Sequence, residues 1–123
     1  MSNTINYPFG KAAKETFLYA DDEINGVVKN QFTMADVSEG ITGATDLNLE
    51  ASDRLQVGAV LILEVTAISG ATNTRTITLD DGVTGVNPTV AEGSTSPQIK
   101  WLQFIFDGTQ FVLLTDTLIK AAV

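Results

Sequence analysis

The sequence contains no cysteine and no histidine. The lack of cysteine excludes disulfides, a thiolate nucleophile and sulfur-ligated zinc. The lack of histidine removes the usual general base near neutral pH and the commonest transition-metal ligand. Any reaction would therefore have to use carboxylates, lysine, tyrosine or hydroxyl groups. We expect no enzymatic activity, no cofactor and no metal.

Basic residues are also few. Seven Lys and Arg stand against fifteen Asp and Glu, so the net charge is -8 at pH 7. Such a chain on average repels phosphate groups and anionic lipid head groups, and no cluster of basic residues offsets this repulsion locally. We therefore expect neither nucleic acid nor a membrane surface among its partners.

Long apolar runs are missing as well. The longest, residues 59–63, is far short of the roughly 20 residues that span a bilayer, and the stretch MSNTINYPFGKAAK lacks the apolar core of a signal peptide. We expect a protein that is made and kept in an aqueous compartment. With 44% hydrophobic and 18% charged residues, the chain of 123 residues is suited to one domain with one core.

Aromatic residues are present near the start of the chain but follow no sustained period of 2 or 3.6. They are Tyr7, Phe9, Phe17 and Tyr19, and they stand among lysines and acidic residues. We interpret residues 1–26 as an extended arm that packs on a partner, because termini without partners are usually poor in aromatics. A frayed terminus is the alternative.

Alternation of apolar and polar residues dominates the rest of the chain and is typical of half-buried strands. No long segment has the apolar period of a helix. The dipeptide Asn25-Gly26 is a turn signal that precedes the first strand. Strands are predicted at residues 27–37, 45–51, 59–68, 76–79 and 89–91.

The strongest local signal is the stretch FIFDGTQFVLL, residues 104–114, in which Asp107-Gly108 separates two apolar runs. Asp-Gly in this position is typical of a tight hairpin turn, since glycine tolerates positive φ and aspartate bonds its own backbone. A two-residue turn predicts that Phe104 pairs with Phe111. A type I turn with a bulge at Gly108 is the alternative, and it shifts the pairing by one residue.

Both faces of this hairpin are apolar. One face carries Leu102, Phe104, Phe111 and Leu113, and the other carries mainly Trp101, Ile105, Val112 and Leu114. Such a hairpin lies either between two layers of its own domain or between its domain and a neighbour. We therefore assign to core or interface the residues Trp101, Phe104, Phe106, Asp107, Gly108 and Phe111.

Short strands, short turns and the lack of helices to connect parallel strands indicate an all-β fold. We expect an antiparallel β-sandwich or jelly-roll-like domain. The predicted organisation is an N-terminal arm at residues 1–26, the β-sandwich at residues 27–117 and a C-terminal tail at residues 118–123.

Other motifs match ligand sites only in part. Asp80-Asp81-Gly82 lacks the alternating ligands of a calcium loop and is better interpreted as a turn, and Asp21-Asp22-Glu23 as a solvated charge run. The Gly-rich residues 40–43 and 82–85 lack the lysine and helix of a phosphate loop. Trp101 lies in a strand dense with Ile and Phe, so core or interface is favoured over a sugar-binding platform.

The run IKWLQFIFDGTQFVLL, residues 99–114, resembles the closing hairpin of small β-rich virion proteins of tailed bacteriophages. In those proteins an aromatic-rich strand enters Asp-Gly-Thr and the chain returns through an aromatic residue and aliphatics. Residues 76–82, a Thr-rich strand that ends at a Gly turn, are similar to the same family in composition.

This resemblance implies a non-enzymatic virion structural protein, either a capsid auxiliary or decoration protein or a head-fibre component, made in the cytoplasm of a bacterial host. It implies binding to capsid or other virion proteins, and a homo-oligomer that is commonly a trimer. The aromatic residues Tyr7, Phe9, Phe17 and Tyr19 would then be anchors on the capsid. The alternative from another class is a carbohydrate-binding β-sandwich module of a tail fibre or secreted protein.

Overall fold

A computed structural model describes residues 13–123, and the fold in this range is all-β. The expected all-β class is confirmed. None of the described residues forms a helix long and apolar enough to cross a membrane. The ten strands are β1 (Ala13–Ala20), β2 (Glu23–Val28), β3 (Phe32–Val37), β4 (Thr45–Ala51), β5 (Val60–Thr66), β6 (Thr74–Leu79), β7 (Val83–Thr84), β8 (Thr89–Ala91), β9 (Ile99–Phe106) and β10 (Phe111–Lys120).

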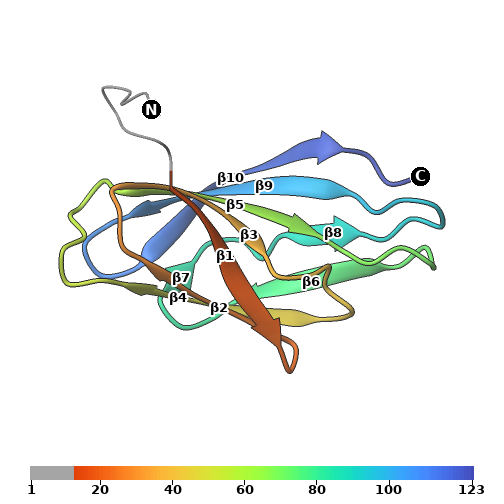
Figure 1. Ribbon diagram of the computed structural model, residues 1–123, viewed down its shortest axis with the longest axis horizontal. Helices are drawn as coiled ribbons and strands as arrows, with labels where there is room; N and C mark the ends of the chain where they lie inside the picture. Colours follow the sequence, from red (N-terminus) through yellow and green to blue (C-terminus); the bar gives the residue numbers. More distant parts are fainter. Residues whose placement is uncertain (1–12) are drawn as a thin grey trace, which may run out of the picture.

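The strands form one mixed sheet in the order β7-β10-β9-β5-β3-β1-β2-β4-β6-β8 (Figure 1). The sheet curls so that β9, β5 and β3 lie over β2, β4 and β6. Strand β1 joins the two halves. Its residues 13–17 pair with β3 in parallel, and residues 18–20 pair with β2 in antiparallel orientation.

Between β2 and β6 the chain alternates between the two halves of the sheet. Strands β3 and β5 are parallel neighbours in one half, and β2, β4 and β6 are parallel neighbours in the other. Parallel neighbours require a crossover connection, which is usually a helix. Here a strand of the opposite half makes each crossover, so the predicted antiparallel arrangement is wrong for these pairs. Antiparallel pairing is confined to β1–β2, β5–β9, β9–β10 and β6–β8.

The concave side of the curled sheet holds one hydrophobic core. Alternate residues of β2, β4, β5 and β9 point into it, as the period of two requires. Burying a large aliphatic or aromatic side chain contributes roughly 1.5 to 3 kcal/mol, so this core is the main source of stability. Among its fully buried members are Ile24, Leu47, Leu61, Leu63, Ile77, Leu102, Phe104 and Phe111.

The predicted arm at residues 1–26 is wrong for the part that the structure describes. Residues 13–20 form β1, and β2 starts at Glu23. Phe17 and Tyr19 are only 3% and 6% exposed and belong to the core, so they are not free to anchor a partner. The sequence does not reveal that Phe17 and Tyr19 point to the core, because the exposed Leu18 between them is also apolar. Tyr7 and Phe9 lie outside the described residues.

Two other predicted boundaries differ from the structure. The strand expected at residues 27–37 is two strands, because β2 ends at Val28 and β3 begins at Phe32. The expected C-terminal tail begins inside β10, which continues to Lys120. Beyond it, the backbone of Val123 exchanges hydrogen bonds of 3.0 Å with Ser96, so the chain end is held against the loop before β9.

Candidate functional site

The closing hairpin forms between β9 and β10, but with a longer loop than predicted. Phe106 pairs with Phe111, and Phe104 pairs with Leu113, so the loop is residues 107–110. This register is two residues away from that of a two-residue turn and one away from the bulged alternative. A shift of two keeps the side chains up to Leu113 on their predicted faces, because the side-chain period of a strand is two, and Leu114 lies in the register shift that follows.

Asp107 organises the loop. Its Oδ1 accepts the backbone N–H groups of Thr109 at 2.8 Å and Gln110 at 2.9 Å, and its own N–H donates to the Gln110 carbonyl. The bonds from Gln110 and Thr109 hold the pKa of the Asp107 carboxyl below its usual value. Gly108 has a φ of 104°, which suits glycine.

The hairpin residues fall into two groups. Phe104, Phe106 and Phe111 point into the core, where the rings of Phe106 and Phe111 lie 5.1 Å apart. Trp101 lies on the other side of β9 and is half-buried, and its Nε1 donates to Oε2 of Glu64 at 2.8 Å. The inner face of the hairpin is therefore core, and its outer face faces away from the domain.

That outer side carries the first candidate interaction surface. The sheet register aligns Phe32, Val60, Ile105 and Val112 in a row across β3, β5, β9 and β10. The next row adds Met34 and Ile62. Phe32 is exposed and the others are half-buried, so none belongs to the core. We call this set, together with Trp101, the apolar outer face: Phe32, Met34, Val60, Ile62, Trp101, Ile105 and Val112.

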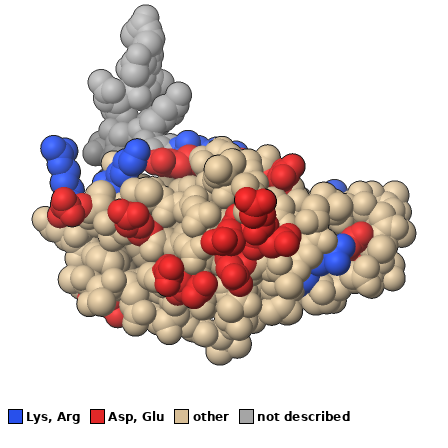
Figure 2. Space-filling model, turned by 90° about the horizontal axis from the view of Figure 1, so that it is seen from below, with Lys and Arg blue, Asp and Glu red and all other residues tan. Residues whose placement is uncertain are grey.

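The opposite half of the sheet presents a different chemistry. Its register places Glu23 beside Asp46, Asn25 beside Asn48, and Val27 beside Glu50. Seen from the side of β2 and β4, carboxylates gather in the middle of the surface, and Lys and Arg lie towards its margins (Figure 2). We call this set, with the neighbouring turn residue Asp81, the acidic outer face: Glu23, Asn25, Asp46, Asn48, Glu50 and Asp81.

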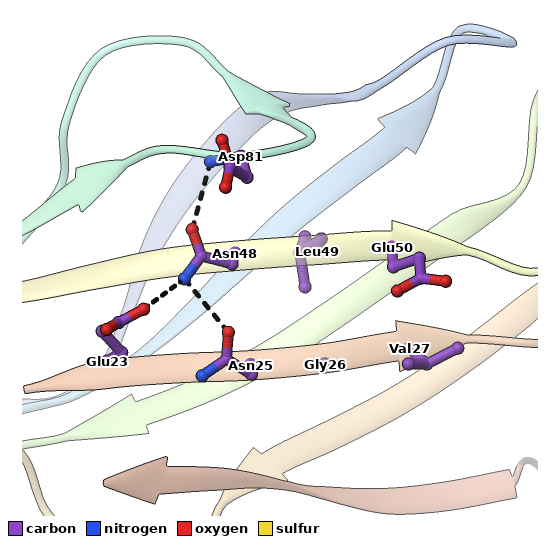
Figure 3. A pocket seen from close by; sticks show the side chains of 8 residues that line it. All are labelled: Glu23, Asn25, Gly26, Val27, Asn48, Leu49, Glu50 and Asp81. Carbon is purple, nitrogen blue, oxygen red and sulfur yellow. Dashed lines mark hydrogen bonds between the residues drawn. The ribbon is translucent and has the colours of Figure 1, made fainter. Parts of the chain in front are cut away.

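A shallow groove of about 350 Å³ runs over the acidic outer face (Figure 3). At its centre, Nδ2 of Asn48 donates to Oε1 of Glu23 at 2.9 Å and to Oδ1 of Asn25 at 3.1 Å. Oδ1 of Asn48 accepts the backbone N–H of Asp81 at 3.1 Å. Asn48 thus ties β2, β4 and the β6–β7 turn together. Within residues 13–123, no group of three or more acidic side chains is placed to hold a metal ion.

The third feature is the outer edge of β10, which sequence reasoning missed because residues 118–123 were assigned to a tail. Strand β7 covers this edge only at Phe111 and Val112. In the described part of the chain, residues 114–120 pair on one side only, with β9. We call residues 114–120 the free edge. Alternation of Thr115 and Thr117 with larger residues was the sequence signal for a strand here.

Comparisons of the chain with protein-family models, with curated proteins and with solved structures found no match.

Proposed function

We propose that this protein is a non-enzymatic virion structural protein of a tailed bacteriophage, most specifically a capsid auxiliary or decoration protein. In this role it binds other virion proteins through the apolar outer face and presents the acidic outer face to solvent, thereby stabilising the capsid or anchoring a fibre. The two facing halves of the curled sheet act as the two layers of a β-sandwich module.

The observation that carries the proposal is the division of the surface into two unlike faces. Four apolar residues, from Phe32 through Val60 and Ile105 to Val112, stand side by side on four neighbouring strands. Contiguous apolar surface of this kind marks interaction sites. The acidic face on the other side favours solubility and repels further copies of the same protein.

The size of the apolar outer face indicates how strong one contact can be. Its two mainly apolar rows extend over four strands about 4.8 Å apart and about four residues of about 3.3 Å each, or roughly 250 Å². Removing that area from water contributes about 6 kcal/mol. Association costs roughly 4 to 15 kcal/mol, so one such face gives weak binding. Several copies held together would bind a repetitive surface such as a capsid much more tightly.

The virion assignment itself is supported by the resemblance of residues 99–114 to phage virion proteins. The proposed partners are capsid or other virion proteins and further copies of this chain. Of the four aromatics first considered as capsid anchors, Tyr7 and Phe9 remain candidates, because Phe17 and Tyr19 are in the core.

The test is cosedimentation of the purified protein with empty capsids of the phage that carries its gene. We expect saturable binding that is lost in Phe32→Lys and in Ile105→Lys. The control Val27→Lys makes the same change of +1 beside Glu50 on the side of the acidic outer face and should leave binding intact. Absence of binding, or a gene that lies outside any phage or prophage genome, would contradict the proposal.

The groove over the acidic outer face is the location that favours the alternative, a carbohydrate-binding module. Its carboxylates and amides could bond sugar hydroxyls, although among residues 13–123 no aromatic ring lines it to stack on a sugar. Saturable binding to a glycan array that Asn25→Ala abolishes would establish the alternative. Unchanged glycan binding in that variant would show that the groove is not the binding site.

A further inference from the structure

We propose that the free edge of β10 pairs with the free edge of a second copy, so that two copies form a two-fold dimer with one sheet running through both. The inference concerns self-association and does not depend on the virion role. Figure 1 shows the last part of β10 running along the rim of the molecule, away from the strands of the other half.

The same edge of β10 already accepts a strand. Strand β7 pairs with Phe111 and Val112 in parallel, and the chain then turns away at Gly85, whose φ is 139°. From residue 114 onwards the outward backbone groups have no strand beside them in the described chain. A row of unpaired N–H and C=O groups on an edge strand is a template for another strand.

Side chains along the free edge also favour burial. Leu114, Leu118 and Ile119 are all exposed. Beside the first of them, a hollow of about 220 Å³ lies between the β7–β8 loop and β10, and Val86 and Leu114 are among its lining residues. A strand added along residues 116–120 would cover apolar surface around Leu118 that is otherwise in contact with water.

The charges on the free edge favour a second copy as the occupant, because acidic and basic residues balance there. The chain as a whole carries -8, so most of its surfaces repel another copy. The free edge is different because it carries Asp116 and Lys120, and Asp116 also pairs with Lys100 at 3.2 Å. An antiparallel pairing centred on Leu118 brings the two Leu118 side chains together, and the register shift at Ile119 puts Asp116 and Lys120 on opposite faces of the sheet, so no like charges meet across the axis. Identical edges that pair in this way close a two-fold dimer.

The ladder that we expect is short. The register shift between Leu118 and Lys120 places Ile119 in a bulge against β9, and bulges increase the twist of an edge. We therefore expect pairing from Asp116 to Lys120, with Leu118 of one copy opposite Leu118 of the second copy. Bulges and lysines also serve to keep edges apart in many proteins. If the bulge and the lysine serve to prevent pairing here, the protein is a monomer.

The absence of cysteine allows a clean test. In the proposed register the two Leu118 positions face each other at the symmetry axis, where paired Cα atoms are about 4.5 to 5.5 Å apart. That separation suits a disulfide. Full-length Leu118→Cys should therefore give covalent dimers on mild oxidation. The control is Leu18→Cys on β1, because Leu18 is 63% exposed, against 51% for Leu118, and lies away from the free edge.

A second measurement uses proteins without cysteine. Analytical ultracentrifugation over a wide concentration range should show a monomer–dimer equilibrium for the natural chain. Leu118→Lys places two like charges face to face and should weaken the dimer by about tenfold or more, whereas Leu18→Lys should leave it unchanged. Equal crosslinking of the two cysteine variants, a monomer at every concentration, or a trimer would overturn the proposal.

Discussion

The ring of Phe17 lies against Gly26, so closely that a Cβ atom on residue 26 would stand 2.5 Å from Cδ2 of the ring. Gly26 is in the middle of β2, where a glycine usually weakens a strand. Here the missing side chain makes room for an aromatic ring in the core. At Phe17, β1 stops pairing with β3, and from Leu18 onwards it pairs with β2.

Substitution Gly26→Ala should therefore destabilise the protein. The added methyl group forces Phe17 or the backbone to move, and overpacking of this kind costs about 1 to 3 kcal/mol. Urea unfolding followed by tryptophan fluorescence measures the change. Gly43→Ala is the matched control, because nothing lies within 4 Å of a Cβ at residue 43. Equal stability of the two variants would show that the Phe17 contact relaxes freely.

The contrast between Gly26 and the real β1–β2 turn explains one failure of sequence reasoning. Asn25-Gly26 has the composition of a turn, but it lies within β2 because the glycine serves packing. The turn is at Asp21-Asp22, where both residues have positive φ, 53° and 61°. Two aspartates are a weaker turn signal than Asn-Gly, so the sequence pointed to the wrong place.

Elsewhere the local signals were sufficient. The strands predicted at residues 45–51, 59–68, 76–79 and 89–91 correspond to β4, β5, β6 and β8. What alternation cannot specify is which strands become neighbours, since parallel and antiparallel pairs share the same period. The alternation of β2 to β6 between two halves, and with it the two unlike outer faces, therefore required the structure.

Substitution Asp21→Asn should stabilise the protein by a few tenths to about 1 kcal/mol. Asparagine adopts positive φ readily and is preferred at the first position of a type I′ turn. It also removes one negative charge beside Asp22 and Glu23. Thermal unfolding at low and high salt separates these causes, because only the charge effect is screened. Asp21→Ala, which removes the same charge but tolerates positive φ poorly, should be less stable than Asp21→Asn at both salt concentrations.

The pair Arg75 and Glu92 should be the most sensitive ion pair in the described chain. Glu92 is buried, it bonds the Arg75 guanidinium, and its Oε1 accepts the backbone N–H of Ala71 at 2.6 Å. Removing one partner of a buried pair leaves an unpaired charge and costs about 3 to 5 kcal/mol. We expect Glu92→Ala to lower the free energy of unfolding by that order.

The exposed pair Lys14 and Asp36, with 3.7 Å between Nζ and Oδ2, provides the comparison. Asp36→Asn should change stability by less than about 1 kcal/mol. Chemical denaturation of both variants gives the difference directly. A small effect of Glu92→Ala, similar to that of Asp36→Asn, would mean that the site opens to water when the carboxylate is lost.

Acid should weaken the hairpin loop through Asp107. The folded pKa of this carboxyl lies below its ordinary value of 3.8, first because of the Gln110 N–H and then because of the Thr109 N–H. A group whose folded pKa is depressed stabilises the fold above the unfolded pKa, and this contribution is lost as the pH falls through the folded pKa. Substitution Asp107→Ala should therefore destabilise the protein near neutral pH and have a smaller effect in acid. Unfolding curves of the natural chain and the variant across this range measure the difference, and a difference independent of pH would show that the loop bonds do not depend on the ionised carboxylate.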